Sequence, residues 1–542
     1  MTVLVLGNQL TARVGPVARR PAERVLLVEA RDFATRRRYH PHRLAAVLAA
    51  MRHFRDRLRA GATGAGEHGG EQGRSVDYRR CETFREGLTA HLEAHPGDDL
   101  VVMRPSAHGA ADRLRDLVEG AGGSLAVVEN DLFLTTPAAF DAWADGEDAD
   151  RLRHEAFYRH VRRETGSLMD GDEPVGGEWN YDEQNRETPP ADYDPPDPPH
   201  FEPDDITERA LANARAWLLD DHWADPGPFR WPVTREAAER ALEDFVTHRL
   251  SAFGPYQDAM VADEWALAHS LLSVPLNLGL LHPHEVVEAA VDAYEAGATG
   301  EPDTTGEADG PDDVEGVPLN SVEGFLRQVL GWREFVRHAY RRGMPDLADA
   351  NRLDAGRALP TWYWTGETDM ACLDATVEGV RTRGYSHHVQ RLMLLSNYAL
   401  LFGVEPRRVR RWFQASHVDG QDWAATPNAV EMGQYAADLF ATKPYAASAN
   451  YVDPLSKYCA DCAYDPDRTT GDGACPFNAL YWDVLDRHED RLGDNPRMAL
   501  VYSHLADRDD DERAAIRERA ATIRDGTATG PPWTGTDGER PY

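Results

Sequence analysis

Val3-Leu4-Val5-Leu6 is the first of four short apolar runs near the start of the chain, and runs of the same kind stand at 25–28, 100–103 and 125–128. Helical patterns such as that of residues 44–58 separate them. Apolar runs of strand length joined by helices are typical of a parallel sheet covered on both faces. The sequence therefore predicts a Rossmann-like α/β domain over residues 1–135.

The chain changes character after this domain. Residues 188–205 are rich in proline and acidic residues, which is typical of an extended linker, so we expect a connecting helix and linker over 136–205. An all-α domain is predicted over 206–510, followed by a C-terminal helix and tail over 511–542. The helical patterns behind this prediction lie at 235–251, 321–340, 374–384 and 387–402. Surface loops are predicted at 61–73, which is rich in glycine, and at 301–315, which is acidic.

The net charge is strongly negative, since 92 acidic residues stand against 58 lysines and arginines and give −34. Lysine occurs only at Lys443 and Lys457, whereas arginine is abundant. This bias is typical of a halophilic protein. At 1 M salt the Debye length is about 3 Å, so the overall charge does not exclude a nucleic-acid partner. The basic runs at 337–342 and 407–411 are candidate contacts to DNA phosphates.

No early run resembles a signal peptide, and no apolar stretch reaches the roughly 18 residues that a membrane span requires. We therefore expect a cytoplasmic protein that has no membrane partner. We also expect the protein to be a monomer.

Four of the five cysteines form a candidate metal centre: Cys459, Cys462 and Cys475 in a C-x2-C-x12-C pattern, with Cys372 upstream. Four thiolates suit either tetrahedral zinc or an iron–sulfur cluster. Pro476 directly after the last cysteine and the many aromatic residues nearby favour a 4Fe-4S cluster over structural zinc or unligated thiols. Spacing alone does not identify the fourth ligand, because 86 residues separate Cys372 from Cys459.

Five motifs in the same order resemble those of the iron–sulfur bacterial cryptochromes and photolyases. Residues 176–186 (GGEWNYDEQNR) are similar to the G-G-x-W-N-[FY]-D-x-x-N-R signature of that family. The others are RQVLGWREF at 327–335, HHVQRLM at 387–393, KPYAAS at 443–448 and GACPFNALYW at 473–482. The resemblance implies an α/β antenna domain and a helical domain that holds FAD and the cluster. It also supplies Cys372 as the fourth ligand, at the end of a W-T-G-x-T-x-M-x-C pattern.

The function implied by this resemblance is light-dependent repair of (6–4) photoproducts in UV-damaged DNA, by electron transfer from photoexcited reduced FAD. His388 would be the proton donor, as imidazolium can be at neutral pH, and His387 its neighbour. Tyr445 and Tyr451 match tyrosines beside flavin and lesion. Electron transfer to the flavin is expected from Trp364, Trp412 and Trp423. The residues expected to bind FAD are Ser270, Ser273, Asn277, Arg333, Arg391, Asn428 and Lys443.

Several positions depart from the family pattern and keep other interpretations open. Phe413 stands where relatives often carry tyrosine, and Ala425 where they often carry glutamate. One alternative is therefore a blue-light photoreceptor of the cryptochrome type without repair activity. Another is nucleic-acid binding by the cluster region, as in the primase large subunit. The antenna site is also altered, because Gly7-Asn8-Gln9-Leu10 replaces G-D-Q-L and Phe33 an acidic residue. Three possibilities are therefore open for the antenna site. It binds 6,7-dimethyl-8-ribityllumazine, it binds a different pigment, or it binds no pigment.

Overall fold

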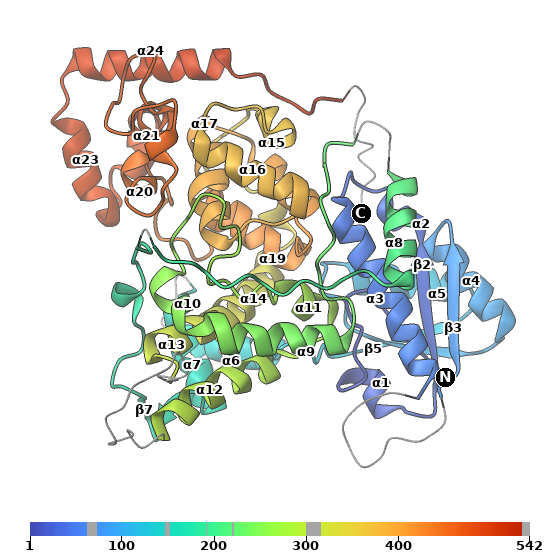
Figure 1. Ribbon diagram of the computed structural model, residues 1–542. Helices are drawn as coiled ribbons and strands as arrows, with labels where there is room; N and C mark the ends of the chain where they lie inside the picture. Colours follow the sequence, from blue (N-terminus) through green and yellow to red (C-terminus); the bar gives the residue numbers. More distant parts are fainter. Residues whose placement is uncertain (62–72, 147–151, 191, 219–221, 300–315, 534–542) are drawn as a thin grey trace.

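The computed structural model describes residues 1–61, 73–146, 152–190, 192–218, 222–299 and 316–533 (Figure 1). Most of the predicted glycine-rich loop and the predicted acidic insertion at 301–315 lie outside these residues. No helix in the described part of the chain is both long and apolar enough to cross a bilayer.

The N-terminal part is built on a parallel five-stranded sheet with the order β3-β2-β1-β4-β5. Four strands are those predicted from the apolar runs. The additional edge strand β3 was missed because its sequence, VDYRRC, is mostly polar. The strands are β1 (Thr2–Val5), β2 (Arg24–Ala30), β3 (Val76–Cys81), β4 (Asp99–Met103) and β5 (Ser124–Val128).

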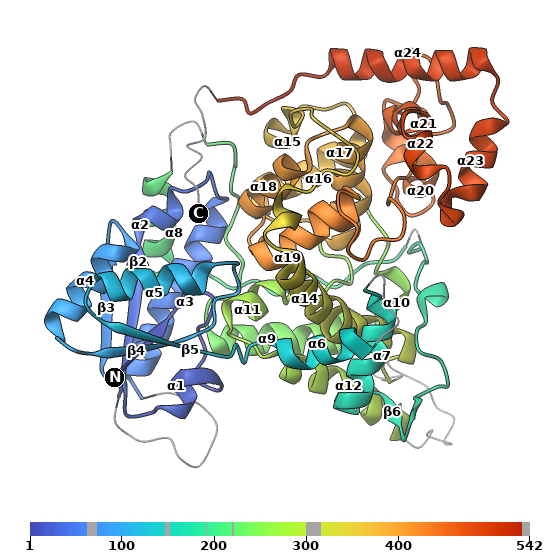
Figure 2. The same ribbon diagram turned by 180° about the vertical axis from the view of Figure 1, so that it is seen from behind.

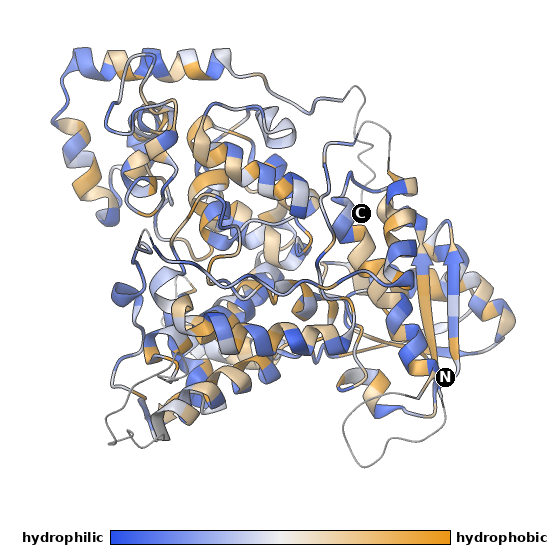
Figure 3. Ribbon diagram, in the orientation of Figure 1, coloured by the Kyte–Doolittle hydropathy of each residue, from blue (hydrophilic) through white to orange (hydrophobic). Residues whose placement is uncertain are grey.

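Both faces of this sheet are covered by helices (Figures 1 and 2). Val3 and Val5 of β1 belong to one buried cluster and Leu4 to another, as expected when neighbouring residues of a strand point to opposite faces. Apolar residues of the strands, orange in Figure 3, are therefore divided between two hydrophobic clusters, one on each face of the sheet. The helices of this part are α1 (Gly15–Arg19), α2 (Arg31–Ala34), α3 (Pro41–Arg59), α4 (Phe84–Ala94) and α5 (Ala110–Gly120), and α8 (Asp205–Trp217) packs on α3.

The connecting segment contains two helices and a small hairpin before the extended linker reaches α8. Its elements are α6 (Pro137–Gly146), α7 (His154–Thr165), β6 (Met169–Asp170) and β7 (Glu173–Pro174).

The rest of the described chain is helical apart from loops. Its helices are α9 (Arg235–Asp244), α10 (Leu250–Tyr256), α11 (Ser273–Leu278), α12 (Pro283–Thr299), α13 (Leu319–Leu326), α14 (Glu334–Gly343), α15 (Trp362–Thr365), α16 (Ala371–Arg383), α17 (Asn397–Phe402), α18 (Pro406–Ser416), α19 (Asp422–Thr426), α20 (Ala449–Val452), α21 (Pro476–Arg487), α22 (Glu489–Leu492), α23 (Ala499–Ala506) and α24 (Asp510–Gly526).

Segments of π-helix lie at Phe245–Arg249, Arg327–Arg333, Gln390–Ser396 and Pro427–Gly433, and the first three interrupt helices predicted from the sequence. Such segments are frequent at functional sites. Three of the residues expected to bind FAD lie in them, namely Arg333, Arg391 and Asn428.

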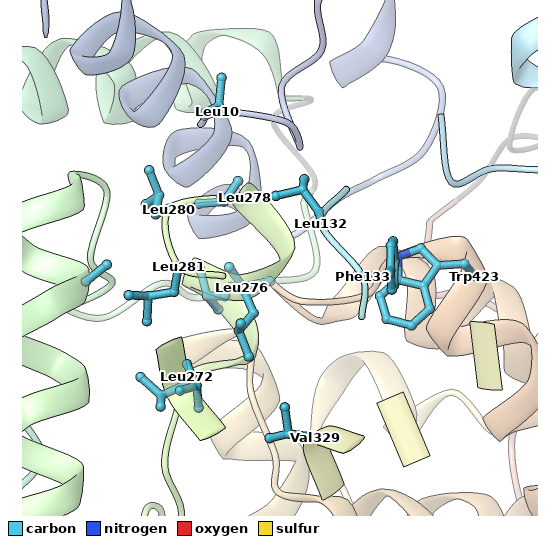
Figure 4. Packing of buried hydrophobic residues seen from close by; sticks show 14 of the residues in the cluster. Leu10, Leu132, Phe133, Leu272, Leu276, Leu278, Leu280, Leu281, Val329 and Trp423 are labelled. Carbon is cyan, nitrogen blue, oxygen red and sulfur yellow. The ribbon is translucent and has the colours of Figure 1, made fainter. Parts of the chain in front are cut away.

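The α/β and helical parts share one hydrophobic core. Leu10 and Leu132 from the α/β part pack in the same cluster as Leu276 and Leu278 of α11 (Figure 4). The backbone N–H of Leu10 donates to the carbonyl of Leu278 at 2.9 Å. This shared core fixes α11, and the serines at its start, against the sheet domain.

Candidate active site and cysteine centre

The predicted histidine pair lies just before a π-helical segment, and its two members have different surroundings. His387 is 2% exposed and stacks on His269 with ring centroids 4.4 Å apart. The side chain of His388 is 47% exposed, and its Nε2 lies 3.4 Å from a carboxylate oxygen of Asp258. Burial lowers the pKa of His269 to about 3 and also lowers that of His387. Both buried rings are therefore neutral near pH 7, and His388 is the member of the trio that has a carboxylate partner.

Asp258 was not singled out in the sequence, where it is one of 92 acidic residues with no motif around it. Burial opposes its charge, but the hydrogen bond and the charge of His388 lower the Asp258 pKa overall. Burial and the charge of Asp258 raise the pKa of Tyr451 to about 12. Tyr445 is 37% exposed, and burial of its hydroxyl raises its pKa. The structure thus pairs the predicted His388 with a carboxylate that was not predicted.

A second group of predicted residues meets at Asp419. One carboxylate oxygen of Asp419 accepts a hydrogen bond from the Ser273 hydroxyl at 2.7 Å and pairs with the Arg391 guanidinium at 3.0 Å. The Asn277 side-chain amide donates to the Asp419 backbone carbonyl at 3.2 Å. The second carboxylate oxygen, Oδ1, is buried without a partner within the described protein. Asp419 was not predicted, although it joins α11 to the π-helical segment that contains Arg391.

The remaining residues expected to bind FAD lie apart from Asp419. The Arg333 guanidinium pairs with Glu334 and packs over the Phe133 ring, 4.3 Å from its centroid. Asn428 is exposed, and its side-chain amide donates to the Ala424 carbonyl. Lys443 and Ser270 are at least partly exposed, and the Ser270 hydroxyl accepts a bond from the Leu272 N–H at 3.4 Å.

Two of the three predicted electron-transfer tryptophans are neighbours. The ring centroids of Trp364 and Trp412 are 6.3 Å apart, and Trp412 is 1% exposed with its Nε1–H bonded to the Tyr363 carbonyl. Trp423 instead packs on Phe133, 5.1 Å away, as Figure 4 shows. Phe413, which stands where relatives often carry tyrosine, is buried, and its ring centroid lies 5.0 Å from that of Trp412.

All four predicted cysteine ligands line one pocket, between α16 and the segment before α21. Cys372 lies in the first turn of α16 and Cys475 directly precedes α21, so both stand where a helix dipole favours a thiolate. Burial, reinforced by the other cysteines, raises the pKa of Cys372, and burial raises that of Cys475 to about 11. The sulfurs are spread out, because among the described residues no three of the four Sγ atoms lie within 4.8 Å of one another.

The two basic runs are only partly on the surface. Arg337 donates to the Thr135 carbonyl and covers Phe133, and Arg410 is 6% exposed. Arg407 and Arg408 both pair with Glu405 and keep exposed side chains. Only some of the arginines in each run are therefore exposed enough to contact DNA phosphates.

Two polar side chains of the α/β domain, those of Gln9 and Glu29, are held by protein groups. The Gln9 side-chain amide donates to the Met103 carbonyl. Glu29 is buried and accepts bonds from Arg52, Tyr78 and Arg80. Whether a ribityllumazine binds here stays a prediction.

Comparison with known proteins identifies the family. The chain is 37% identical over 530 residues to a (6-4) photolyase of Agrobacterium fabrum, which covers 96% of this chain and 98% of that protein. The chain belongs to the photolyase family. A family model described as deoxyribodipyrimidine photo-lyase-related protein matches residues 3–231 of this photolyase.

Solved structures show the same fold. A bacterial class III photolyase from Agrobacterium tumefaciens aligns with a TM-score of 0.56 at 16% identity, covering 97% of each chain. A cryptochrome of Synechocystis sp. PCC6803 aligns with a TM-score of 0.54 at 14% identity, covering 96% of this photolyase and 98% of the cryptochrome. The predicted fold and the predicted light-dependent DNA repair are thereby confirmed. Membership of the family implies FAD as cofactor and UV-damaged DNA as substrate.

Proposed function

We propose that this protein is a (6–4) photolyase, which reverts pyrimidine–pyrimidone (6–4) photoproducts with an electron from photoexcited reduced FAD. The observation that carries the proposal is the exposed His388 beside Asp258, next to two buried neutral histidines. Full-length similarity to a protein named (6-4) photolyase supports it.

Reversal of this lesion needs a proton, because the hydroxyl group must return to the 5′ base as the electron arrives. His388 directs Nε2 toward Asp258, so Nδ1–H of the imidazolium is the proton to be given to the lesion. The Asp258 carboxylate holds the ring in this orientation. Tyr451 keeps its hydroxyl proton at neutral pH, because its pKa is raised to about 12, and is thus a hydrogen-bond donor in the same site.

The group around Asp419 fits a flavin. Ser273 and Asn277 of this group offer hydroxyl and amide groups to the cofactor, and the Arg391 cation suits the anionic reduced ring. Ser270, which lies apart from Asp419, remains a predicted contact. Asp419 orients Arg391 and Ser273, and its buried unpartnered Oδ1 is a remaining acceptor for a cofactor donor. When bound, FAD supplies the light-driven electron. Asn428 and Lys443 remain predicted contacts, whereas Arg333 is occupied by Glu334 and Phe133.

The cysteine pocket suits a 4Fe-4S cluster better than zinc. In a tetrahedral zinc site with Zn–S bonds of about 2.3 Å, the sulfurs are only about 3.8 Å apart. A four-iron cluster holds its thiolates farther apart, since each binds a different iron. The spread of the four Sγ atoms favours the second arrangement. Cys372, Cys459, Cys462 and Cys475 would then tie α16 to α21 through the cluster.

Repair of defined substrates under blue light in molar salt tests the proposal. We expect the reduced protein to repair the (6–4) photoproduct and not the cyclobutane dimer. His388→Ala should abolish repair while the flavin stays bound. Binding of the lesion without repair of either substrate would contradict the proposal and favour the photoreceptor alternative.

A further inference from the structure

The end of helix α4 carries two histidines on one face. His91 and His95 are four residues apart, and the His95 N–H donates to the His91 carbonyl at 2.9 Å, which continues the helical turn just beyond the last residue of α4. Their ring centroids are 4.9 Å apart. Two imidazoles at this spacing on a helix can bind one metal ion together, as they do in zinc enzymes.

The topology of the sheet brings carboxylates to the same place. Helix α4 follows strand β3 and leads back to the start of β4, so its last turn lies at the amino ends of the parallel strands. Asp77 is the second residue of β3, and Asp98 directly precedes β4. One ligand atom from each of Asp77, His91 and His95 lies within 4.8 Å of the other two. Figures 1 and 2 show β3 and α4 at the outer edge of the α/β part, away from the helical part.

His91 is fully buried between the two carboxylates. Its Nδ1 lies 2.7 Å from Oδ2 of Asp77, and its Nε2 lies 3.3 Å from Oδ2 of Asp98. A histidine that binds a metal through one ring nitrogen usually donates its other N–H to a carboxylate, which fixes the orientation of the ring. Asp98 stands in that position and is itself held by the Thr2 hydroxyl at 2.5 Å. Nδ1 therefore faces Asp77 as a second ligand of the same ion would.

We propose that Asp77, His91 and His95 form a binding site for a divalent ion of the late first transition series, such as Ni²⁺, with water completing its coordination. Two imidazoles and one carboxylate suit these ions, whereas Mg²⁺ and Ca²⁺ prefer oxygen ligands. The ion takes the place of the proton between His91 and Asp77. Bonds of about 2.0–2.1 Å put tetrahedral ligand atoms about 3.3 Å apart. The half-buried side chains of Asp77 and His95 therefore turn to meet the ion at His91.

Arg79 competes with the ion, because its guanidinium pairs with both carboxylate oxygens of Asp77, at 2.7 and 2.8 Å. Binding is therefore reversible, and the ion is lost to a chelator during purification. A bound ion joins the last turn of α4 to the polar edge strand β3. Because it binds the folded chain, it raises the stability of the protein. The inference does not depend on the proposed repair function, since the site shares no residue with the groups around Asp258 and Asp419.

Titration of the flavin-loaded, cluster-containing protein with Ni²⁺ tests the proposal. Molar KCl screens loose ion pairing and leaves metal–imidazole bonds intact. After treatment with a chelator, bound Ni²⁺ is measured by equilibrium dialysis, and the thermal midpoint of unfolding is measured in parallel. We expect one Ni²⁺ at this site, a higher midpoint, and no effect of Mg²⁺ at the same concentration. His95→Gln should abolish this binding, and Asp98→Asn, which changes only the partner of His91, should weaken it by about tenfold.

Two control variants test whether the ion is at this site. His284→Gln changes an exposed histidine of α12, whose Nδ1 lies 2.9 Å from a carboxylate oxygen of Glu288, four residues away. His388→Gln changes a second trio with ligand atoms within 4.8 Å of one another, which His388 forms with His269 and His387. Both variants should bind Ni²⁺ with the affinity of the parent.

Parent-like affinity and midpoint shift in His95→Gln would overturn the proposal. So would a parent protein that binds no stoichiometric Ni²⁺, or a loss in either control that equals the loss in His95→Gln. Far-ultraviolet circular dichroism without metal checks that His95→Gln is folded. Asp98→Asn gives an independent answer, because unchanged affinity in that variant would also contradict the site.

Discussion

Nε2 of His388 lies 3.4 Å from a carboxylate oxygen of Asp258. This contact joins the turn before the π-helical segment Gln390–Ser396 to the loop after α10. The exposed imidazole is thus held by a partly buried acid. Two buried rings, those of His269 and His387, pack against His388. The arrangement resembles other sites in which a carboxylate fixes the orientation of a histidine that moves a proton.

Asp258→Asn should slow repair while lesion binding stays unchanged. The amide keeps the shape of the side chain but removes the charge that accompanies the imidazolium. General acid catalysis contributes about 10²–10⁴-fold, so we expect a loss of about 100-fold in single-turnover repair. The control is Asp263→Asn, an exposed acid in the same loop. A rate equal to that of the parent at every pH would exclude a role of Asp258 in orienting His388.

Replacing Asp419 by alanine should lower flavin affinity by about tenfold, or about 1.4 kcal/mol, because Arg391 and Ser273 lose their common partner. The flavin-to-protein ratio and a fluorescence titration measure this directly. Gln421→Ala changes a neighbouring side chain and should retain flavin fully. Equal affinity in both variants would place the cofactor elsewhere.

Iron analysis separates the two possible metals. We expect about four irons per chain and no zinc after anaerobic purification. Cys462→Ser should lose the cluster and much of the folding yield, since ligand binding and folding are coupled. Cys81→Ser, which changes a cysteine on β3 outside the pocket, should keep both. Stoichiometric zinc in the parent protein would refute the cluster.

The buried histidines predict loss of stability in acid. The pKa of His269 is about 3 in the folded state and about 6.5 when unfolded, so below pH 6.5 the unfolded state binds more protons. Stability should therefore fall as pH decreases from 6.5, by about 1.4 kcal/mol per pH unit for this residue alone. Urea unfolding at pH 7 and pH 5 measures the change, and His269→Gln should reduce the slope. An unchanged slope would show that the ring is not neutral in the folded protein.

Salt should act in opposite directions on folding and on DNA binding. A chain of net charge −34 repels itself in dilute buffer, so its thermal midpoint should rise with KCl. DNA affinity should fall, because phosphate contacts release counterions. Replacing both Arg407 and Arg408 by glutamine should reduce the slope of log affinity against log salt by about two at most. Arg115→Gln, in the α/β domain, is the control. An unaltered slope would place the DNA surface elsewhere.

The sequence was sufficient for the parts of the fold that depend on local patterning. The apolar runs predicted four strands, but β3 could not be found, because an edge strand with Asp77, Arg79 and Arg80 has no apolar signal. Periodicity likewise placed the helices but not their π-helical segments, which differ from α-helix by a single inserted residue.

Only those residues of the candidate site that belong to sequence motifs could be predicted. His388, Arg391 and the cysteines belong to recognisable patterns, and the structure brings the cysteines into one pocket. Asp258 and Asp419 were missed because an acid that acts through a distant partner resembles any other acid in this chain. The trio of Asp77, His91 and His95 was missed as well, since only folding brings the strand residue to the two histidines.

The core shared by Leu10, Leu132 and α11 limits how this protein can be recombined. An α/β domain taken from a relative would meet α11 with side chains shaped for a different partner, and a fragment ending before the linker would expose Leu10 and Leu132 to water. Changes on one side of this contact must therefore be matched on the other. The α/β domain could be exchanged between family members only together with the segment that follows His269, so the serines proposed to bind flavin would be inherited with it.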